Sequence, residues 1–130
     1  MKKIIAVLLL LSTLVCSVPA VYAVEVPEVQ PCSTYIESID AGLSISSNTA
    51  TCTSMFRLTS SHRVRLVMYL QQYVNGRWDT IMTWEKTGTA YASLNKTKSV
   101  TSGGTYRVHA VGYVLDANGV ILEVGRYIDP

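Results

Sequence analysis

Few side chains in this chain have the chemistry that catalysis requires, and the sequence does not group them. The two histidines are His62, in a turn-like segment, and His109, in a strand-like one. A hydrolytic triad would need one of them beside an acid such as Asp79 and a serine, but no Gly-x-Ser-x-Gly motif occurs. Glu85 and Glu123 lie in strand-like segments and show no sign of the carboxylate pair that glycoside cleavage needs. No metal-binding or phosphate-binding motif is present, so we expect no enzymatic activity, no cofactor and no metal site.

Residues 1–23 have the three parts of a secretory signal peptide. Two lysines follow the initial methionine, an apolar run covers residues 4–15, and small or short side chains at 21–23 mark a cleavage site. We therefore expect this segment to be removed and the rest of the chain to be secreted to the extracellular space. Lipidation at Cys16 is disfavoured, because Val15 stands where a lipidated cysteine needs a small residue.

Charge and hydropathy argue against two kinds of partner. The chain has 11 Lys and Arg against 9 Asp and Glu, and Lys2 and Lys3 would leave with the signal peptide. The mature chain then has a net charge near zero, without the basic stripe of a nucleic-acid-binding protein. No second apolar run approaches the roughly 20 residues that cross a bilayer, so we expect no membrane span in the mature chain.

Two cysteines remain after the signal peptide, Cys32 and Cys52. An even number in an exported chain predicts one disulfide between them. Closing that loop would stabilise the fold by about 3 kcal/mol in the chain-entropy model. Two unpaired thiols are the alternative. Neither cysteine lies in a Cys-x-x-Cys motif or at metal-ligand spacing, so redox catalysis and zinc binding are not expected.

From Tyr35 onward the chain is rich in Val, Ile, Thr and Tyr and is interrupted by Gly, Asn and Ser, which predicts short strands. We expect an extended leader over 24–34 and one domain over 35–130. The predicted strands cover 35–40, 43–46, 49–58, 90–100, 106–115 and 120–128, with two more on either side of Asn75-Gly76. Seven or eight strands with turn signals about every ten residues predict an antiparallel β-sandwich.

Two Asn-Gly pairs predict tight hairpins, because this pair suits the two-residue type I′ turn. Asn75-Gly76 lies between two strand-like runs, and its predicted register extends back to Val67 opposite Trp84. Asn118-Gly119 predicts the same kind of hairpin near the C-terminus.

The stretch over residues 100–108, Val-Thr-Ser-Gly-Gly-Thr-Tyr-Arg-Val, resembles the turn into strand F of immunoglobulin-like and fibronectin-like sandwiches. The resemblance implies that Tyr106 packs back over the preceding turn as a tyrosine corner. The chain departs from antibody-type domains, since Val108 stands where their second cysteine lies and no core tryptophan follows Cys52 at the usual distance. Residues 35–129 as a whole resemble small, uncharacterised exported proteins of Gram-positive bacteria, a family of unknown function. That resemblance implies an immunoglobulin-like β-sandwich and export, and brings no catalytic residues.

The hairpin register predicts which side chains share a face, because alternate residues of a strand point to opposite sides of the sheet. Aliphatic residues form the set that we expect in the core: Val64, Leu66, Met68, Leu70 and Ile81. Aromatic and other large apolar residues form the set that we expect on the outer face: Val67, Tyr69, Tyr73, Trp78, Met82 and Trp84, with His109 and Tyr113 beside them. Two alternatives stay open: a bulge near Gln71-Gln72 that exchanges the faces, or cover of the tryptophans by the leader or by residues 86–89.

An apolar face of this size would exceed the few hundred Å² that a monomer usually exposes, which indicates a surface for recognition. We therefore expect a secreted, non-enzymatic binding module whose partner is a protein or glycan at a cell surface, or a second copy of the chain. The expected binding residues are Tyr69, Tyr73, Trp78, Met82, Trp84 and Tyr113. A small secreted antagonist, similar to a bacteriocin, is a second hypothesis. A hydrolase that uses His62 or His109 beside a carboxylate is a third.

Overall fold

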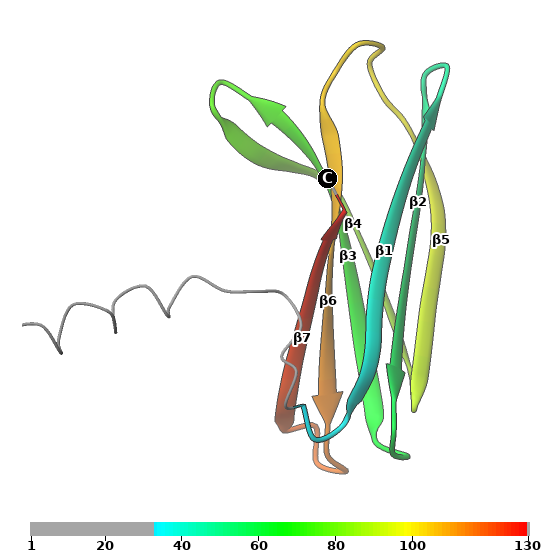
Figure 1. Ribbon diagram of the computed structural model, residues 1–130, viewed down its shortest axis with the longest axis vertical. Coiled ribbons are helices and arrows are strands. Elements are labelled where there is room, and N and C mark those ends of the chain that lie inside the picture. The colour runs from blue at the N-terminus through cyan, green and yellow to red at the C-terminus, as the bar shows by residue number, and fades with distance from the viewer. Residues whose placement is uncertain (1–32, 130) are drawn as a thin grey trace, which may run out of the picture.

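Seven antiparallel strands in two sheets make up residues 33–129, the part of the chain that the computed structural model describes (Figure 1). They are β1 (Ile36–Ser46), β2 (Thr49–Leu58), β3 (Arg63–Val74), β4 (Arg77–Thr89), β5 (Tyr91–Ser99), β6 (Tyr106–Leu115) and β7 (Ile121–Asp129). No residue in this range is helical, which confirms the all-β prediction, and so no helix there could cross a membrane. The predicted signal peptide and most of the predicted leader lie outside the described residues.

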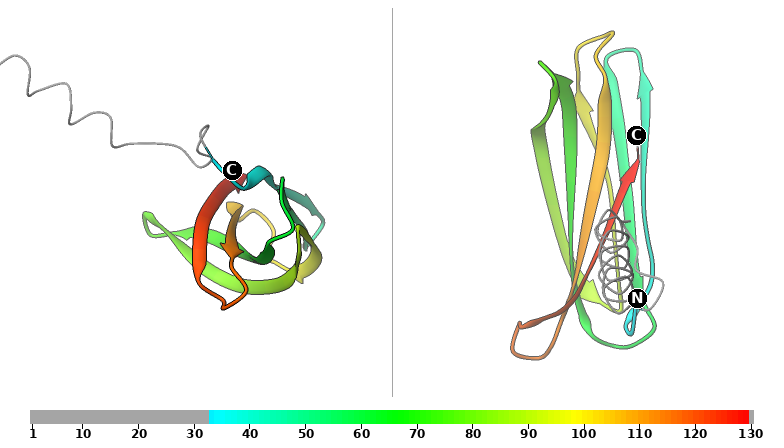
Figure 2. Two further views of the ribbon diagram at one scale, coloured as in Figure 1. Left: turned by 90° about the horizontal axis from the view of Figure 1, so that it is seen from below. Right: turned by 60° about the vertical axis from the view of Figure 1, so that its left-hand side comes forward.

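The two sheets pack face to face as a β-sandwich. One sheet has the strand order β1-β2-β5 and the other β4-β3-β6-β7, and all neighbouring strands are antiparallel. Seen from one end, the strands surround an elongated interior, with β7 next to β1 (Figure 2). The backbone N–H of Leu43 donates to the Asp129 carboxylate at 2.9 Å and joins the two sheets at this border.

The core lies between the sheets, and its largest share comes from alternate residues of β2, β3 and β6, with Ile39 and Ala41 of β1 and Ala92 and Leu94 of β5. The inward rows are Ala50, Cys52, Ser54, Phe56 and Leu58 of β2, Val64, Leu66, Met68 and Leu70 of β3, and Tyr106, Val108, Ala110, Gly112 and Val114 of β6. The β3 row confirms the aliphatic residues of that strand that the sequence predicted for the core. A Cβ added at Gly112 would lie 2.6 Å from the Phe56 ring, so the glycine lets that ring lie against β6. Fully burying each large side chain contributes about 1.5–3 kcal/mol.

Strand β1 is continuous, so the predicted break between residues 40 and 43 was wrong. Gly42 pairs with Thr53 of β2 inside the ladder, and its φ is not positive. A glycine in extended backbone can continue a strand, because nothing in its conformation requires a turn. A Cβ at Gly42 would lie 2.7 Å from Oγ1 of Thr53, which explains why this position has no side chain.

The hairpin between β3 and β4 begins as predicted and then changes register. Asn75 and Gly76 have φ of 52° and 83°, as a type I′ turn requires. A bulge follows between the pairs Leu70–Met82 and Gln71–Thr80, which leaves Ile81 as an extra residue in β4. Val67 therefore lies opposite Glu85, and the predicted pairing of Val67 with Trp84 was wrong.

The hairpin between β6 and β7 is not of the predicted type. Only Gly119 has a positive φ, of 81°, whereas a type I′ turn needs two such residues. The Asp116 carboxylate accepts hydrogen bonds from the backbone N–H groups of Asn118 and Val120, each at 2.8 Å, and holds a longer turn. The strands on either side are nevertheless where the sequence predicted them.

Tyr106 forms the predicted tyrosine corner at the start of β6. Its hydroxyl donates to the Thr101 carbonyl at 3.0 Å and accepts from the Thr101 N–H at 3.1 Å. The ring lies so close over Gly104 that a Cβ there would be 2.6 Å from the hydroxyl oxygen. Tyr106 thereby satisfies two backbone groups of the turn that connects the sheets.

Cys52 is a buried thiol, and its predicted disulfide partner, Cys32, lies outside the described residues. Within residues 33–129 Cys52 has no disulfide, so the pairing stays a prediction. Burial raises the pKa of the Cys52 thiol to about 11, which makes it unreactive at neutral pH.

We predict that Tyr106→Phe lowers the free energy of unfolding by about 1–3 kcal/mol, because the Thr101 N–H and carbonyl lose their partner. Urea denaturation measures the change. Tyr91→Phe is the control, since Tyr91 is 42% exposed and its hydroxyl is free to bond to water. Equal denaturation midpoints for the two variants would contradict the tyrosine-corner role.

Candidate functional site

The bulge in β4 divides the predicted binding residues between the two sides of the β4-β3-β6-β7 sheet. Four of them lie on the outer face, which points away from the other sheet: Tyr69, Tyr73, Trp78 and Tyr113. Met82 and Trp84 pack against the core instead, so their predicted place on the outer face was wrong. The extra residue Ile81 puts Met82 opposite Leu70 and Trp84 opposite Met68, and both partners are completely buried.

A shallow hollow of about 310 Å³ opens on this outer face, and we call it the outer hollow. All four strands of the sheet contribute to its lining: Tyr69, Gln71, Thr80, His109, Val111, Tyr113 and Arg126. Val111 and its cross-strand partner Val67 are each only 4% exposed although they lie outside the main core. The outer face thus has a small apolar layer of its own beneath the aromatic side chains.

Tyr113 lies under an arginine whose charge is already paired. The Arg65 guanidinium is 5.5 Å from the centre of the Tyr113 ring, within the range of a cation–π contact. Arg65 also donates to both carboxylate oxygens of Glu85, at 2.7 and 3.1 Å, which raises the pKa of Arg65 and lowers the pKa of Glu85. An exposed pair of this kind adds little stability, so its main effect is to orient Arg65 over the ring.

A second cluster lies next to the outer hollow, at the end opposite Tyr113. It consists of Tyr73, Trp78 and Arg107, and we call it the upper rim. The two aromatic rings are 5.1 Å apart, and the Arg107 guanidinium lies 4.3 Å from the centre of the Trp78 ring. Nε of Arg107 donates to Oε1 of Gln71 at 2.7 Å, which connects the upper rim to the hollow. Partial burial lowers the pKa of Arg107, but a guanidinium stays charged at physiological pH.

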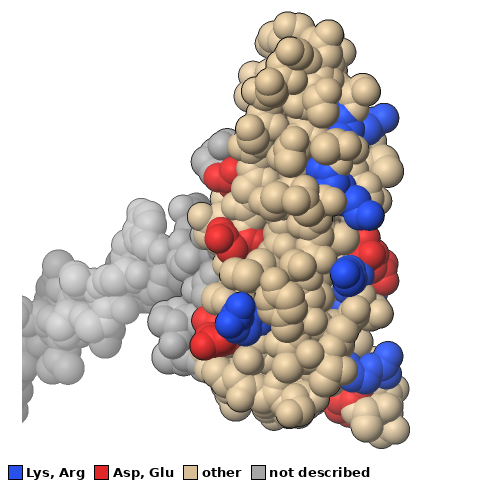
Figure 3. Space-filling model, turned by 90° about the vertical axis from the view of Figure 1, so that its right-hand side faces the viewer, with Lys and Arg blue, Asp and Glu red and all other residues tan. Residues whose placement is uncertain are grey.

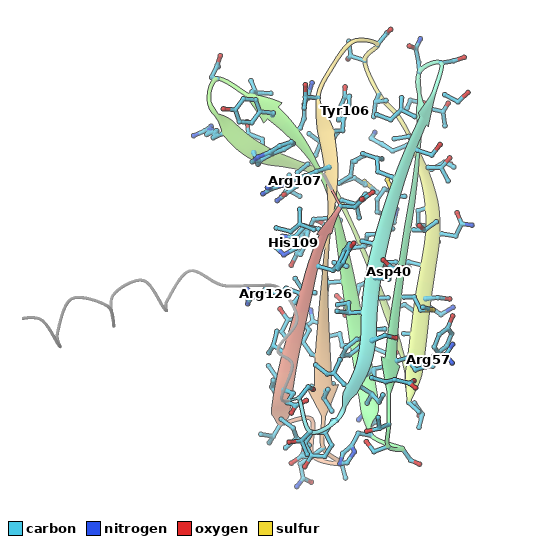
Figure 4. The ribbon with its side chains drawn as sticks, in the orientation of Figure 1. Asp40, Arg57, Tyr106, Arg107, His109 and Arg126 are labelled. Carbon is cyan, nitrogen blue, oxygen red and sulfur yellow. The ribbon has the colours of Figure 1, made fainter. Side chains whose placement is uncertain are left out.

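His109 lies between two arginines on this face. Figure 4 shows Arg107, His109 and Arg126 one below another on the side away from the β1-β2-β5 sheet. The His109 ring is 5.8 Å from the Tyr69 ring, and its Nε2 is buried without a hydrogen-bond partner in the described structure. Burial first, and then the charges of Arg107 and Arg126, lower the pKa of His109, so the ring is neutral near pH 7.

Arg107 and Arg126 are not neutralised by any carboxylate in the described part of the chain. The ion pairs there involve Arg57 with Glu37, Arg65 with Glu85, and Arg77 with Asp79. The outer hollow and the upper rim therefore combine aromatic rings with two positive charges that no carboxylate of residues 33–129 neutralises.

The residues considered for catalysis lie apart. His62 contacts Oγ of Ser60 through Nδ1 at 2.6 Å, whereas Asp79 pairs with Arg77 at the tip of the β3–β4 hairpin. Glu123 accepts hydrogen bonds from the backbone N–H groups of residues 34 and 35, at 2.8 and 3.1 Å, and so anchors the chain where it enters β1. Among residues 33–129 no three potential metal ligands come together.

The outer face of the β1-β2-β5 sheet has a different character. Small polar side chains dominate its rows, among them Ser44, Thr51, Thr53, Asn95 and Thr97. The side of the molecule shown in Figure 3 has a broad band of uncharged side chains, with most of the visible Lys and Arg along one border. Arg57 lies 5.3 Å from the Tyr91 ring and pairs with Glu37 at 3.8 Å, so this sheet provides an arginine–tyrosine pair for comparison.

Sequence reasoning placed Tyr69, Tyr73 and Tyr113 on the outer face of the β4-β3-β6-β7 sheet but missed Arg107 and Arg126. Arg107 is two residues before His109 on β6, so strand alternation alone could have assigned it to the outer face. Arg126 pairs with Val111 across the β6–β7 hairpin, and that register depended on the turn that was predicted incorrectly.

Comparison with known proteins supplies no relative from which a function could be transferred: no family profile matches this chain, and no curated protein matches it.

We predict that the two tryptophans differ in their effect on stability. Trp84→Ala should lower the free energy of unfolding by roughly 2 kcal/mol or more, because it opens a space beside Met68. Trp78→Ala should cost less than about 1 kcal/mol, because it removes only contacts on the outer face. Thermal or urea denaturation measures both variants, and equal losses would contradict the assignment of Trp84 to the core and Trp78 to the surface.

The low pKa of His109 predicts a loss of stability in acid. The unfolded chain takes up the His109 proton near the ordinary histidine pKa of about 6.5, while the native protein resists protonation until a lower pH. The free energy of unfolding should therefore fall as the pH drops below that ordinary value. His109→Gln should reduce this fall, as measured by urea denaturation between about pH 7 and pH 5. An unchanged pH dependence would contradict the assignment.

Proposed function

We propose that this chain is a secreted, non-enzymatic binding protein with an immunoglobulin-like sandwich, and that it recognises a partner at a cell surface through the outer hollow and upper rim. The observation that carries the proposal is the combination, on one sheet face, of partly exposed aromatic rings with two arginines that have no carboxylate partner among residues 33–129. The basic and apolar start of the chain supports export.

The strand order supports the immunoglobulin-like assignment. In such sandwiches strands C, F and G share one sheet, and variable-type domains add strand C′ to it, while strands A, B and E belong to the other. The third, sixth and seventh strands here share a sheet with the fourth, and the first, second and fifth form the other. Tyr106 lies at the start of the sixth strand, where the tyrosine corner of strand F is found.

Electrostatics supports a binding role for this face over a purely structural one. Burial first, and then the charges of Arg107 and Arg126, lower the pKa of His109, so protonation of this ring is unfavourable without a compensating negative charge. Arrangements that oppose stability in this way are characteristic of functional sites. A partner that brings negative charge would neutralise the positive potential of the two arginines around His109.

The test is binding of the labelled mature domain to cell surfaces and to isolated wall and matrix material. We predict that a double variant, Tyr69→Ala with Tyr113→Ala, loses most of the binding while its fold is retained. Circular dichroism and thermal denaturation check the fold. Tyr91→Ala, on the outer face of the other sheet, is the matched control and should bind like the wild type. Equal binding by the double variant and the wild type would refute the proposed role of this face.

A further inference from the structure

We infer that the ligand of the outer hollow is an acidic sugar: a ring that packs on Tyr69 and Tyr113 and carries a carboxylate held by Arg126, with Arg107 as a second cation at the rim. This inference rests on the proposed function and names the class of ligand for that site.

The two arginines determine the charge of the ligand. Both lack a carboxylate partner among residues 33–129, and no acidic side chain lines the outer hollow. A planar guanidinium matches a carboxylate with two parallel hydrogen bonds, which makes arginine suited to this group. Arg126 is exposed and has no ion-pair partner within the described part of the chain, so its guanidinium is accessible for such a pair. Arg107 is held by Gln71 and Trp78, and contributes positive potential at a fixed place.

The backbone beneath the hollow restricts how a ligand can be recognised. Strand β3 pairs with β4 on one side and β6 on the other, and β6 pairs in turn with β7. The N–H and C=O groups of β3 and β6 below the hollow are therefore used inside the sheet. A peptide that binds as an added strand needs a free sheet edge, which this position does not provide. Recognition must come from side chains, which here are aromatic rings, amides, hydroxyls and guanidinium groups.

The lining favours a ring over a flexible acidic chain. The hollow, of about 310 Å³, is at the lower end of the roughly 300–1,000 Å³ typical of small-ligand sites. Arg65 covers one side of the Tyr113 ring and His109 lies beside Tyr69, and the area that the two tyrosines expose to the hollow combines apolar carbon with a polar tip, which suits a sugar ring that has both C–H and hydroxyl groups. Gln71 donates to Oγ1 of Thr80 at 3.2 Å and accepts from Arg107, and the second N–H of Gln71 and the hydroxyl proton of Thr80 add neutral donors for sugar hydroxyl groups. An acidic peptide would use the arginines but would leave this aromatic area without a matching surface.

The pKa of His109 should report whether a charged ligand is bound in the outer hollow. The groups that face it are Tyr69 of β3, Arg107 of its own strand and Arg126 of β7. A carboxylate bound at Arg126 would oppose the positive charges that lower the pKa of His109, and so would raise that pKa. His62 contacts Ser60 and Tyr35 instead, and its signal should not respond to the ligand.

The experiment uses the mature protein with short galacturonate oligomers as the acidic sugar and their methyl esters as the neutral match. Isothermal calorimetry at low salt measures affinity, and proton NMR follows His109 and His62 against pH. We expect the acid form to bind, the methyl ester to bind at least tenfold more weakly, and the pKa of His109 to rise with the acid form alone. Arg126→Gln and Tyr113→Ala should each weaken binding about tenfold or more. Arg57→Gln, which removes a paired arginine beside a tyrosine on the opposite sheet, should bind like the wild type.

Two results would overturn the inference. Polyglutamate that binds as tightly as the galacturonate oligomers, with no loss in Tyr113→Ala, would show recognition of charge without a sugar ring. Absence of binding to the acidic oligomers would also overturn it. In that case, the cell-surface test of the Tyr69→Ala, Tyr113→Ala double variant separates the two proposals. Loss of surface binding in that variant would leave the proposed function standing with another ligand, and retention would refute both.

Discussion

The inward row of β3 is the constraint on which the rest of the structure depends. Val64, Leu66, Met68 and Leu70 are completely buried, and their strand lies between β4 and β6 in the larger sheet. Because side chains alternate along a strand, burial of this row directs residues 65, 67, 69 and 71 to the outer face. A shift of one residue would expose the whole row, and each fully exposed side chain would cost about 1.5–3 kcal/mol. The outer hollow therefore exists because the core cannot be packed in another register.

The bulge at Ile81 decides how much aromatic surface that face presents. Without it, Met82 and Trp84 would join Tyr69 on the outside and form a broad apolar surface suited to another protein. With it, both side chains close the interior at the β4 edge, and the outer face is left smaller and more polar. The same bulge separates the regular part of the β3–β4 hairpin from its tip, where Trp78 meets Arg107. One extra residue thus changes the outer face from an apolar patch to a mixed aromatic and cationic one.

The arginines on the outer faces of the sheets are partnered in two different ways. Arg57 and Arg65 each lie beside a tyrosine and are neutralised by a glutamate. Arg107 and Arg126 flank a histidine whose pKa is lowered by burial and then by their charges, with no carboxylate beside them in the described structure. Stability alone would favour a carboxylate near such a pair, since opposite charges within a few ångströms attract. The unpaired arginines are what connects the packing of this sheet to a proposal about an acidic ligand.

The sequence by itself determined the elements and their inward rows. Alternation in β2, β3 and β6, the Asn75-Gly76 turn and the tyrosine corner at Tyr106 all follow from local residue types, because turn conformation and side-chain parity are local properties. Only the tertiary structure decided the pairing beyond the bulge, the inward position of Trp84 and the gathering of Arg107 and Arg126 around His109. These three features depend on how strands that are distant in the chain align. A single bulged residue in one strand changes that alignment, and the residue types of that strand do not show where the bulge lies.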